Sequence, residues 1–139
     1  MSLGKQSRAQ VNAVRQRVFS RDLNTCIVWG TEWFLAYPCA GALTIQHSVT
    51  RGMGGSAKYD GIDFLRTMCA HHNTLETANA LFKDVCLENG WSVPRWLADT
   101  EGIRVIPVRY QDGWHLLQDG ERVPISEDTA QQIWEDLGF

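Results

Sequence analysis

Two short strands followed by a helix are the clearest elements that the pattern of apolar and polar residues predicts. Residues 42–47, ALTIQH, alternate apolar and polar positions as a half-buried strand does, and residues 64–68, FLRTM, read as a second short strand. The RGMGG segment between them is expected to be a loop, because its three glycines accept positive φ. A helix is predicted from about His71 to Glu88, where Asn89-Gly90 ends it. Its expected inner stripe consists of Leu75, Ala78, Leu81, Phe82 and Val85.

The end of the chain alternates apolar and polar residues again, over residues 103–126. Turn candidates at Asp112-Gly113 and Asp119-Gly120 divide this stretch and allow either two strands or three. Ser126 is expected to cap a final helix, because its hydroxyl can accept from the backbone of the first turn. The C-terminal part therefore predicts a β-hairpin, or three strands, followed by a helix.

The start of the chain predicts one more helix, over about residues 7–20, where valines recur at helical spacing. The chain of 139 residues permits one compact core with little left for a second. We therefore predict the α+β class. Residues 1–96 would form the main domain, and residues 97–139 would form an acidic hairpin-and-helix appendage packed on it.

Charge is distributed unevenly along the chain. Residues 1–95 carry ten Lys/Arg against seven Asp/Glu, a net of +3, whereas residues 96–139 carry three against nine, a net of −6. A basic body is typical of a phosphate-binding face, and an acidic tail is either a solvated surface or a docking element for a protein partner. No apolar run approaches the roughly 20 residues that a bilayer requires, and the first residues lack a signal-peptide core. We therefore expect a cytoplasmic protein with no membrane association.

Four cysteines in a reducing compartment favour metal binding over disulfides. Cys69 and His72 form a Cys-x-x-His pair at the predicted helix start, and Cys26 and Cys39 are the upstream thiols that can complete four zinc ligands. The alternatives are three buried thiols without a metal, or His71 in place of His72. The fourth cysteine, Cys86, falls on the helix stripe and is predicted to be a core residue.

Polar residues beside the glycine loop suggest acid–base chemistry on a phosphate. His47 lies where the first strand meets the loop, a position that suits a general base. Asn73 and Gln46 offer amide oxygens to a hard cation such as Mg²⁺ or Mn²⁺. Arg51, on the loop, suits a scissile phosphate, although it is equally suited to pairing with Asp60 or Asp63.

The two halves of this unit resemble the HNH endonucleases, the ββα-metal nucleases, and in particular their short phage-encoded members. QHSVTRGMGGS, residues 46–56, resembles the first half of the family motif, and CAHHN, residues 69–73, resembles the second half. RVFSRDLNTC, residues 17–26, resembles the segment before the first zinc cysteine. The resemblance covers roughly residues 15–96. His72 stands where the family has its second zinc cysteine, and Asn73 stands where it has a metal-binding histidine.

The resemblance implies a zinc-stapled ββα-metal domain that hydrolyses DNA in the cytoplasm of a phage host. It implies structural zinc on the Cys/His set, catalytic Mg²⁺ or Mn²⁺ on Asn73 and Gln46, and His47 as general base with Arg51 on the phosphate. Gln46 departs from the family's Asp or His, Phe64 stands near the family's central asparagine, and the first zinc pair is stretched. These departures favour an alternative, a catalytically weak or inactive nucleic-acid-binding or phage scaffold module. The acidic C-terminal part is a possible site for a phage protein partner.

Overall fold

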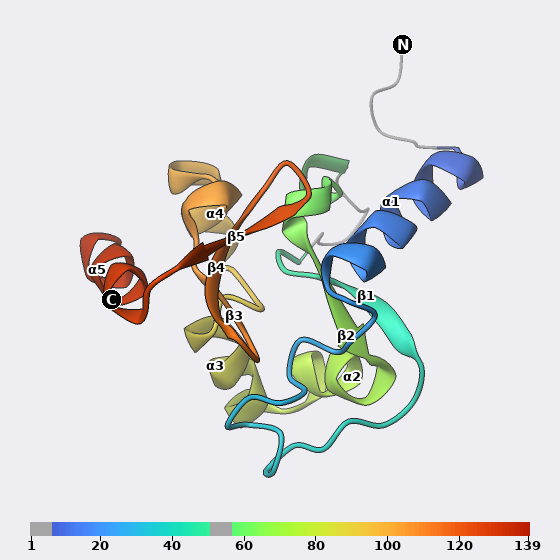
Figure 1. The fold of residues 1–139 in the computed structure, drawn as a ribbon, viewed down its shortest axis with the longest axis horizontal. Helices are drawn as coiled ribbons and strands as arrows, with labels where there is room; N and C mark the ends of the chain where they lie inside the picture. Colours follow the sequence, from blue (N-terminus) through green and yellow to red (C-terminus); the bar gives the residue numbers. More distant parts are fainter. Residues whose placement is uncertain (1–6, 51–56) are drawn as a thin grey trace.

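The β1–β2 pair and the helix that follows it form the centre of the fold (Figure 1). A computed structural model describes residues 7–50 and 57–139. Its helices are α1 (Arg8–Arg21), α2 (Ala70–Ala78), α3 (Ala80–Glu88), α4 (Arg95–Glu101) and α5 (Glu127–Asp136). Its strands are β1 (Leu43–His47), β2 (Leu65–Cys69), β3 (Val108–Tyr110), β4 (Gly113–Gln118) and β5 (Glu121–Ile125). Short 3₁₀ turns cover Ala57–Tyr59, Ile62–Phe64 and Ile103–Val105. The α+β class is confirmed.

The two predicted strands are present, with bounds within one residue of those expected, and a helix follows the second strand. The RGMGG segment that was predicted to be a loop lies outside the described residues. β1 and β2 pair antiparallel, with Leu43 opposite Cys69 and His47 opposite Leu65. Cys69 ends β2 and is at the same time the N-cap of α2, since its Sγ accepts from the backbone N–H of His72. The strand therefore passes into the helix without a connecting loop, which fixes the first turn of α2 against the sheet.

The single helix expected over residues 71–88 is wrong, because the chain breaks at Asn79 into α2 and α3. Asn79 has extended backbone angles, φ −129° and ψ 113°, and its side chain accepts from the N–H of Phe82 at 3.0 Å. An asparagine amide that bonds nearby backbone competes with helix continuation and starts a new helix instead. The break turns Leu81 outward, with 71% of its surface exposed, and leaves Ala78 exposed as well.

The C-terminal part contains three strands in the order β3-β4-β5. The predicted turn at Asp119-Gly120 is confirmed, whereas the first turn is one residue earlier than predicted, at Gln111-Asp112, because Gly113 already belongs to β4 and pairs with Tyr110. Asp119 and Gly120 have positive φ, 54° and 82°, as a tight turn between twisted strands requires. Ser126 caps α5 as predicted, accepting from the N–H of Thr129 at 3.0 Å. The helix α4 was not predicted, and the expected domain boundary after residue 96 falls inside it.

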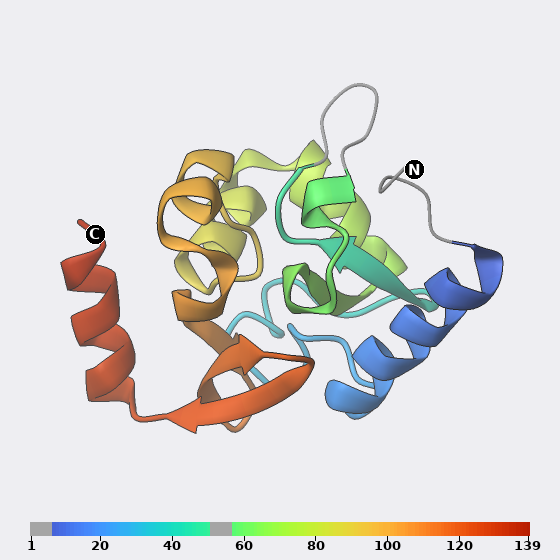
Figure 2. The ribbon, with the colours of Figure 1, turned by 90° about the horizontal axis from the view of Figure 1, so that it is seen from above.

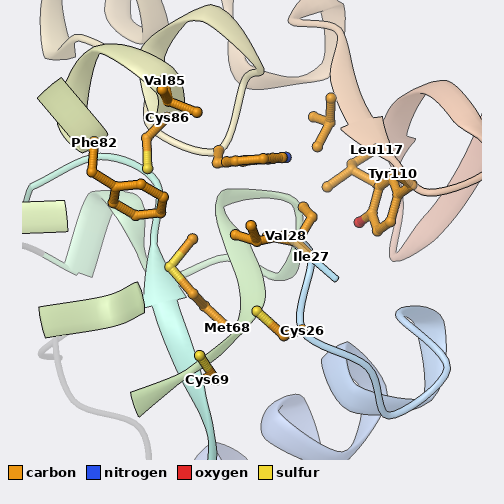
Figure 3. Packing of buried hydrophobic residues seen from close by; sticks show 12 residues of the cluster. Cys26, Ile27, Val28, Met68, Cys69, Phe82, Val85, Cys86, Tyr110 and Leu117 are labelled. Atoms are coloured by element: carbon orange, nitrogen blue, oxygen red, sulfur yellow. The ribbon is translucent and has the colours of Figure 1, made fainter. Parts of the chain in front are cut away.

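Both predicted parts of the chain contribute to the same core (Figure 3). Met68 and Phe82 from the hairpin–helix unit and Leu117 from β4 belong to one buried cluster, and each is fully buried. Its other members are Cys26, Ile27, Val28, Cys69, Val85, Cys86, Trp91, Val108 and Tyr110. A second cluster lies around Val49, Tyr59, Val93, Leu97, Ala98, Ile103 and Ile106, with Trp134 and Leu137 of the C-terminal segment packed against it.

A buried polar network around Asp22 ties three segments of the chain together. Its carboxylate accepts from Nε and Nη2 of Arg21 at 2.8 and 2.9 Å, from the Tyr110 hydroxyl at 2.7 Å, and from the N–H of Thr67 at 2.9 Å. Burial opposes the charge of Asp22, but the hydrogen bonds and charge of Arg21 hold its pKa below the usual range. Asp22 therefore joins the end of α1, strand β2 and strand β3 through one charged group.

Asp22→Asn should lower the free energy of unfolding by about 3 kcal/mol, because it leaves Arg21 as a buried charge without its partner. Urea unfolding at pH 7 measures this, with Asp84→Asn, at an exposed position of α3, as the control expected to change stability by less than about 0.5 kcal/mol. A depressed carboxylate pKa stabilises the folded state above the unfolded pKa of about 3.9 and loses that contribution as the pH falls further. The difference in unfolding free energy between wild type and Asp22→Asn should therefore shrink in acid. If Asp22→Asn loses no more stability at pH 7 than the Asp84→Asn control, the role of Asp22 is contradicted.

Candidate metal centre

Cys26, Cys39, Cys69 and His72 converge on one point at the junction of β2 and α2. Their ligand atoms all lie within 4.8 Å of one another, and within the described ranges 7–50 and 57–139 this is the group of such side chains placed to hold a metal ion. Cys26, Cys69 and His72 are buried and Cys39 is partly buried. The Cys₃His set predicted from the sequence is thus assembled in space.

The distances inside this cluster match a tetrahedral zinc site. The sulfurs of Cys69, Cys26 and Cys39 lie 3.1, 3.4 and 3.8 Å from Nδ1 of His72. Zinc–sulfur and zinc–nitrogen bonds of about 2.3 and 2.0–2.1 Å put adjacent sulfur and nitrogen ligands about 3.6 Å apart in a tetrahedron. Three thiols and an imidazole with this spacing fit a closed, structural zinc.

A hydrogen bond outside the cluster sets the tautomer of His72. Its Nε2 lies 2.5 Å from the carbonyl oxygen of Tyr37, a group that can only accept, so Nε2 carries the proton. The lone pair is then on Nδ1, which points at the three sulfurs. Burial lowers the pKa of His72, which keeps the ring neutral as a metal ligand must be. Tyr37 could not be predicted from the sequence, because a backbone carbonyl can come from any residue.

Two thiols of the cluster, those of Cys26 and Cys39, lie in surroundings that oppose their ionisation. Burial raises the pKa of Cys26, and burial together with the neighbouring Cys26 and Cys69 raises the pKa of Cys39. Without a metal the three sulfurs would be crowded thiols, each a poor hydrogen-bond partner for the others. With a bound Zn²⁺ they would be thiolates, since a coordinating thiol is deprotonated by the metal's charge.

Local backbone contacts explain how two distant cysteines reach the helix start. The N–H of Ile27 donates to the carbonyl of Thr67 at 2.9 Å, which places Cys26 along the outer edge of β2. On the other side, the N–H groups of Ala70 and His71 donate to the carbonyls of Ala42 and Ala40, and these bonds bring Cys39 beside α2. The long segment between the two cysteines is therefore a loop closed at both ends on β2 and α2.

The other two candidates for zinc lie outside the cluster. His71 is exposed on α2, so His72 is the histidine that faces the sulfurs. Cys86 is fully buried in the main core, where burial raises its pKa to about 12. It is a protonated core side chain, as its place on the helix stripe predicted.

The predicted general base lies at the end of β1, next to a carboxylate that the sequence did not single out for it. Nε2 of His47 is 3.4 Å from Oδ1 of Asp60, and both side chains are partly exposed, 35% and 23%. Asp60 follows the 3₁₀ turn Ala57–Tyr59, thirteen positions after the histidine. No fixed spacing links such a pair, so only the fold could reveal it.

The two predicted amide ligands share the opposite face of β1. Nδ2 of Asn73 donates to Oγ1 of Thr44 at 2.8 Å and to the carbonyl of Ile45 at 3.3 Å, so α2 covers the Thr44 face. Gln46 alternates with Thr44 and lies on that face too, buried to 3% exposure and opposite Arg66. His47 points to the other face of β1, away from the two amides.

Two remaining sequence predictions concern the loop and the position of Phe64. Arg51 lies outside the described residues. Phe64 is partly buried and packs edge-on against Tyr59, and its carbonyl accepts from the N–H of Ser48 at 3.0 Å. The backbone of Phe64 therefore holds the chain just after His47, although its side chain cannot take the asparagine's hydrogen-bonding role.

Comparisons with protein-family models, with curated proteins and with solved structures found no match. Among the helices of residues 7–50 and 57–139, none combines the length and apolar character that crossing a membrane would require. The residues of the site are thus the basis for a functional assignment.

Proposed function

We propose that this protein is a zinc-stapled endonuclease of the HNH type, which hydrolyses phosphodiester bonds in DNA with the help of a divalent cation. The observation that carries the proposal is the pairing of His47 with Asp60 at the end of β1, on a strand–helix unit whose junction holds the Cys₃His cluster. A histidine oriented by a carboxylate and partly open to solvent has the arrangement of a general base.

In the proposed reaction His47 takes a proton from a water molecule as the water oxygen attacks phosphorus. A P–O bond to the water forms, the bond to the departing sugar oxygen breaks, and that oxygen is protonated from solvent. Asp60 orients the ring and stabilises the imidazolium that proton transfer creates, since its carboxylate lies against Nε2. A bound Mg²⁺ or Mn²⁺ would supply positive charge for the phosphate and the leaving oxygen. Arg51 is proposed to contact the same phosphate.

Asn73 is the better placed of the two proposed cation ligands. Both hydrogen bonds of its side chain run from Nδ2 to β1, and a planar amide then directs its oxygen away from the strand. Gln46 shares this face of β1 but is buried, so it is less accessible to a hydrated cation and is the weaker ligand. A zinc held by Cys26, Cys39, Cys69 and His72 would have four protein ligands and no open position, so a cation for catalysis would bind elsewhere.

The competing proposal is a nucleic-acid-binding or phage scaffold module that has the fold without the chemistry. The burial and neutrality of Gln46 favour it, as does the apolar side chain of Phe64. A plasmid-cleavage assay separates the two proposals. Relaxation and linearisation of the plasmid by zinc-loaded protein are compared with added Mg²⁺, with added Mn²⁺ and without an added cation. Cutting that requires the added cation supports the nuclease; no cutting under any condition supports the binding module.

Gln46→Asp should lower the Mg²⁺ concentration for half-maximal cleavage by about tenfold, because a carboxylate binds this cation better than an amide does. Gln46→Asn is the matched control, since it shortens the side chain equally without adding charge. It should not improve cation dependence. Titration of plasmid cleavage against Mg²⁺ gives both values. Equal behaviour of the two variants would remove Gln46 from the cation site.

A further inference from the structure

The first helix is a basic rod that extends from the fold. α1 contains four arginines and no acidic residue among its 14 residues. Every residue from Arg8 to Ala13 is exposed, whereas only Val18 and Arg21 are buried, both near its C-terminal end. Figure 2 shows α1 at one edge of the molecule, with its first turns directed away from the rest. Ser7 caps it with a capping box, so its first turn is formed by local bonds.

α1 lies on the face of the β1–β2 pair that carries His47. Residues directly opposite in an antiparallel pair point to the same face, as do alternate residues of one strand. His47 is opposite Leu65, and Thr67 is two residues further along β2, so all three point the same way. The hydroxyl of Thr67 donates to the carbonyl of Val18 in α1. A ligand lying along α1 would therefore approach the face of His47.

The exposed arginines of α1 are divided between two sides of the helix. Arg8 and Arg15 are seven positions apart and so lie on the same side, two turns from each other, with the exposed Asn12 between them. Arg17 lies on the opposite side, where its Nη2 reaches the carbonyl of Asp119 in the acidic β4–β5 turn at 3.4 Å. The side with Arg8 and Arg15 is thus the side remote from the acidic part of the chain.

The dimensions and chemistry of α1 suit duplex DNA. A helix of 14 residues is about 21 Å long, and the major groove, about 12 Å wide, admits an α-helix. Arginines bind phosphates or guanine, and an asparagine is the side chain that pairs with adenine in that groove. Phe19 is the one aromatic residue of α1, so the helix has no platform on which successive unpaired bases would stack.

We infer that α1 docks on duplex DNA through Arg8 and Arg15, with Asn12 facing the bases, and holds the duplex against the His47 face of the β1–β2 pair. This inference rests on the proposed function, because it names how the substrate of that site is bound. It assigns a binding surface separate from the residues proposed for cleavage.

The test measures binding without cleavage. A fluorescein-labelled 24-base-pair duplex is titrated by polarisation with zinc-loaded protein carrying His47→Ala, with no added Mg²⁺, over a range of NaCl concentrations. Each lost phosphate contact lowers the slope of log K against log salt by about 0.9, which is about eightfold in affinity near 0.1 M salt. Arg8→Gln with Arg15→Gln should therefore reduce the slope by about 1.8 and weaken binding by roughly 60-fold. Lysines at both positions should restore the slope.

Arg17→Gln is the matched control, because it removes the same charge from the same helix on the other side. It should change affinity by less than about twofold, and circular dichroism should show equal helix content in all variants. The inference is overturned if Arg17→Gln weakens binding as much as Arg15→Gln alone does, or if the double variant binds duplex DNA like its parent. It is also overturned if a 24-nucleotide single strand binds as tightly as the duplex and with the same dependence on these arginines. Cleavage by the unmodified protein is scored separately. Arginine-dependent binding without cleavage would support α1 as the DNA-docking helix and contradict only the proposed nuclease activity.

Discussion

Removal of zinc is expected to unfold the protein at room temperature. The four ligands join the segment after α1, the loop before β1 and the start of α2. Structural zinc sites contribute about 10–16 kcal/mol of apparent binding free energy, whereas a whole domain is stable by about 5–15 kcal/mol. Cys69→Ser should therefore give a chain that lacks cooperative thermal unfolding and has lost zinc.

Cys86→Ala is the matched control for this experiment, because it also removes one buried thiol but lies outside the cluster. It should cost about 1 kcal/mol and keep the metal. Elemental analysis of the unmodified protein and of Cys86→Ala should give about one zinc per chain, and strong chelation should abolish the unfolding transition of both. A folded, zinc-free preparation of the unmodified protein would contradict the assignment of a structural zinc to this cluster.

The zinc set was predictable because few residues in this chain can bind zinc. Once Cys86 is assigned to the helix stripe, three cysteines remain, and one of them forms a Cys-x-x-His pair with His72; the fold brings these four residues together. The long spacing between Cys26 and Cys39 carried little information, since closing a long loop costs little more than closing a short one. What the sequence could not supply was the bond from His72 to the Tyr37 carbonyl, which depends on the path of the loop.

The helix break at Asn79 shows a different limit of sequence interpretation. The apolar spacing continues across Asn79, so periodicity alone favours one helix, and only the competition between its side chain and the backbone ends α2 there. The same limit applies to Asp60, because the 3₁₀ turn that carries it toward His47 has no apolar period to reveal it. Local polar contacts of this kind decide both the geometry of the site and the places where pattern-based prediction fails.

His47→Ala is expected to reduce the rate of DNA cleavage by about 100- to 10,000-fold, because it removes the proposed general base. The side chain is 35% exposed at the end of β1, so its loss should leave the thermal midpoint nearly unchanged. Duplex affinity should also be kept, since the proposed phosphate contacts of α1 are made by other residues. The effect therefore belongs to kcat and can be measured at saturating DNA and Mg²⁺.

His71→Ala is the matched control, since His71 is exposed on α2 and is not a member of the Cys₃His cluster. It should cut DNA at the rate of the unmodified protein. Asp60→Asn tests the pairing itself, because it keeps the shape of the side chain and removes the charge that stabilises the imidazolium. Asp60→Asn should lower the cleavage rate less than His47→Ala does. The double variant should cleave no more slowly than His47→Ala alone, because Asp60 acts through the histidine. If His47→Ala cuts as fast as the unmodified protein, the base lies elsewhere. If the two losses multiply, Asp60 has a role independent of His47.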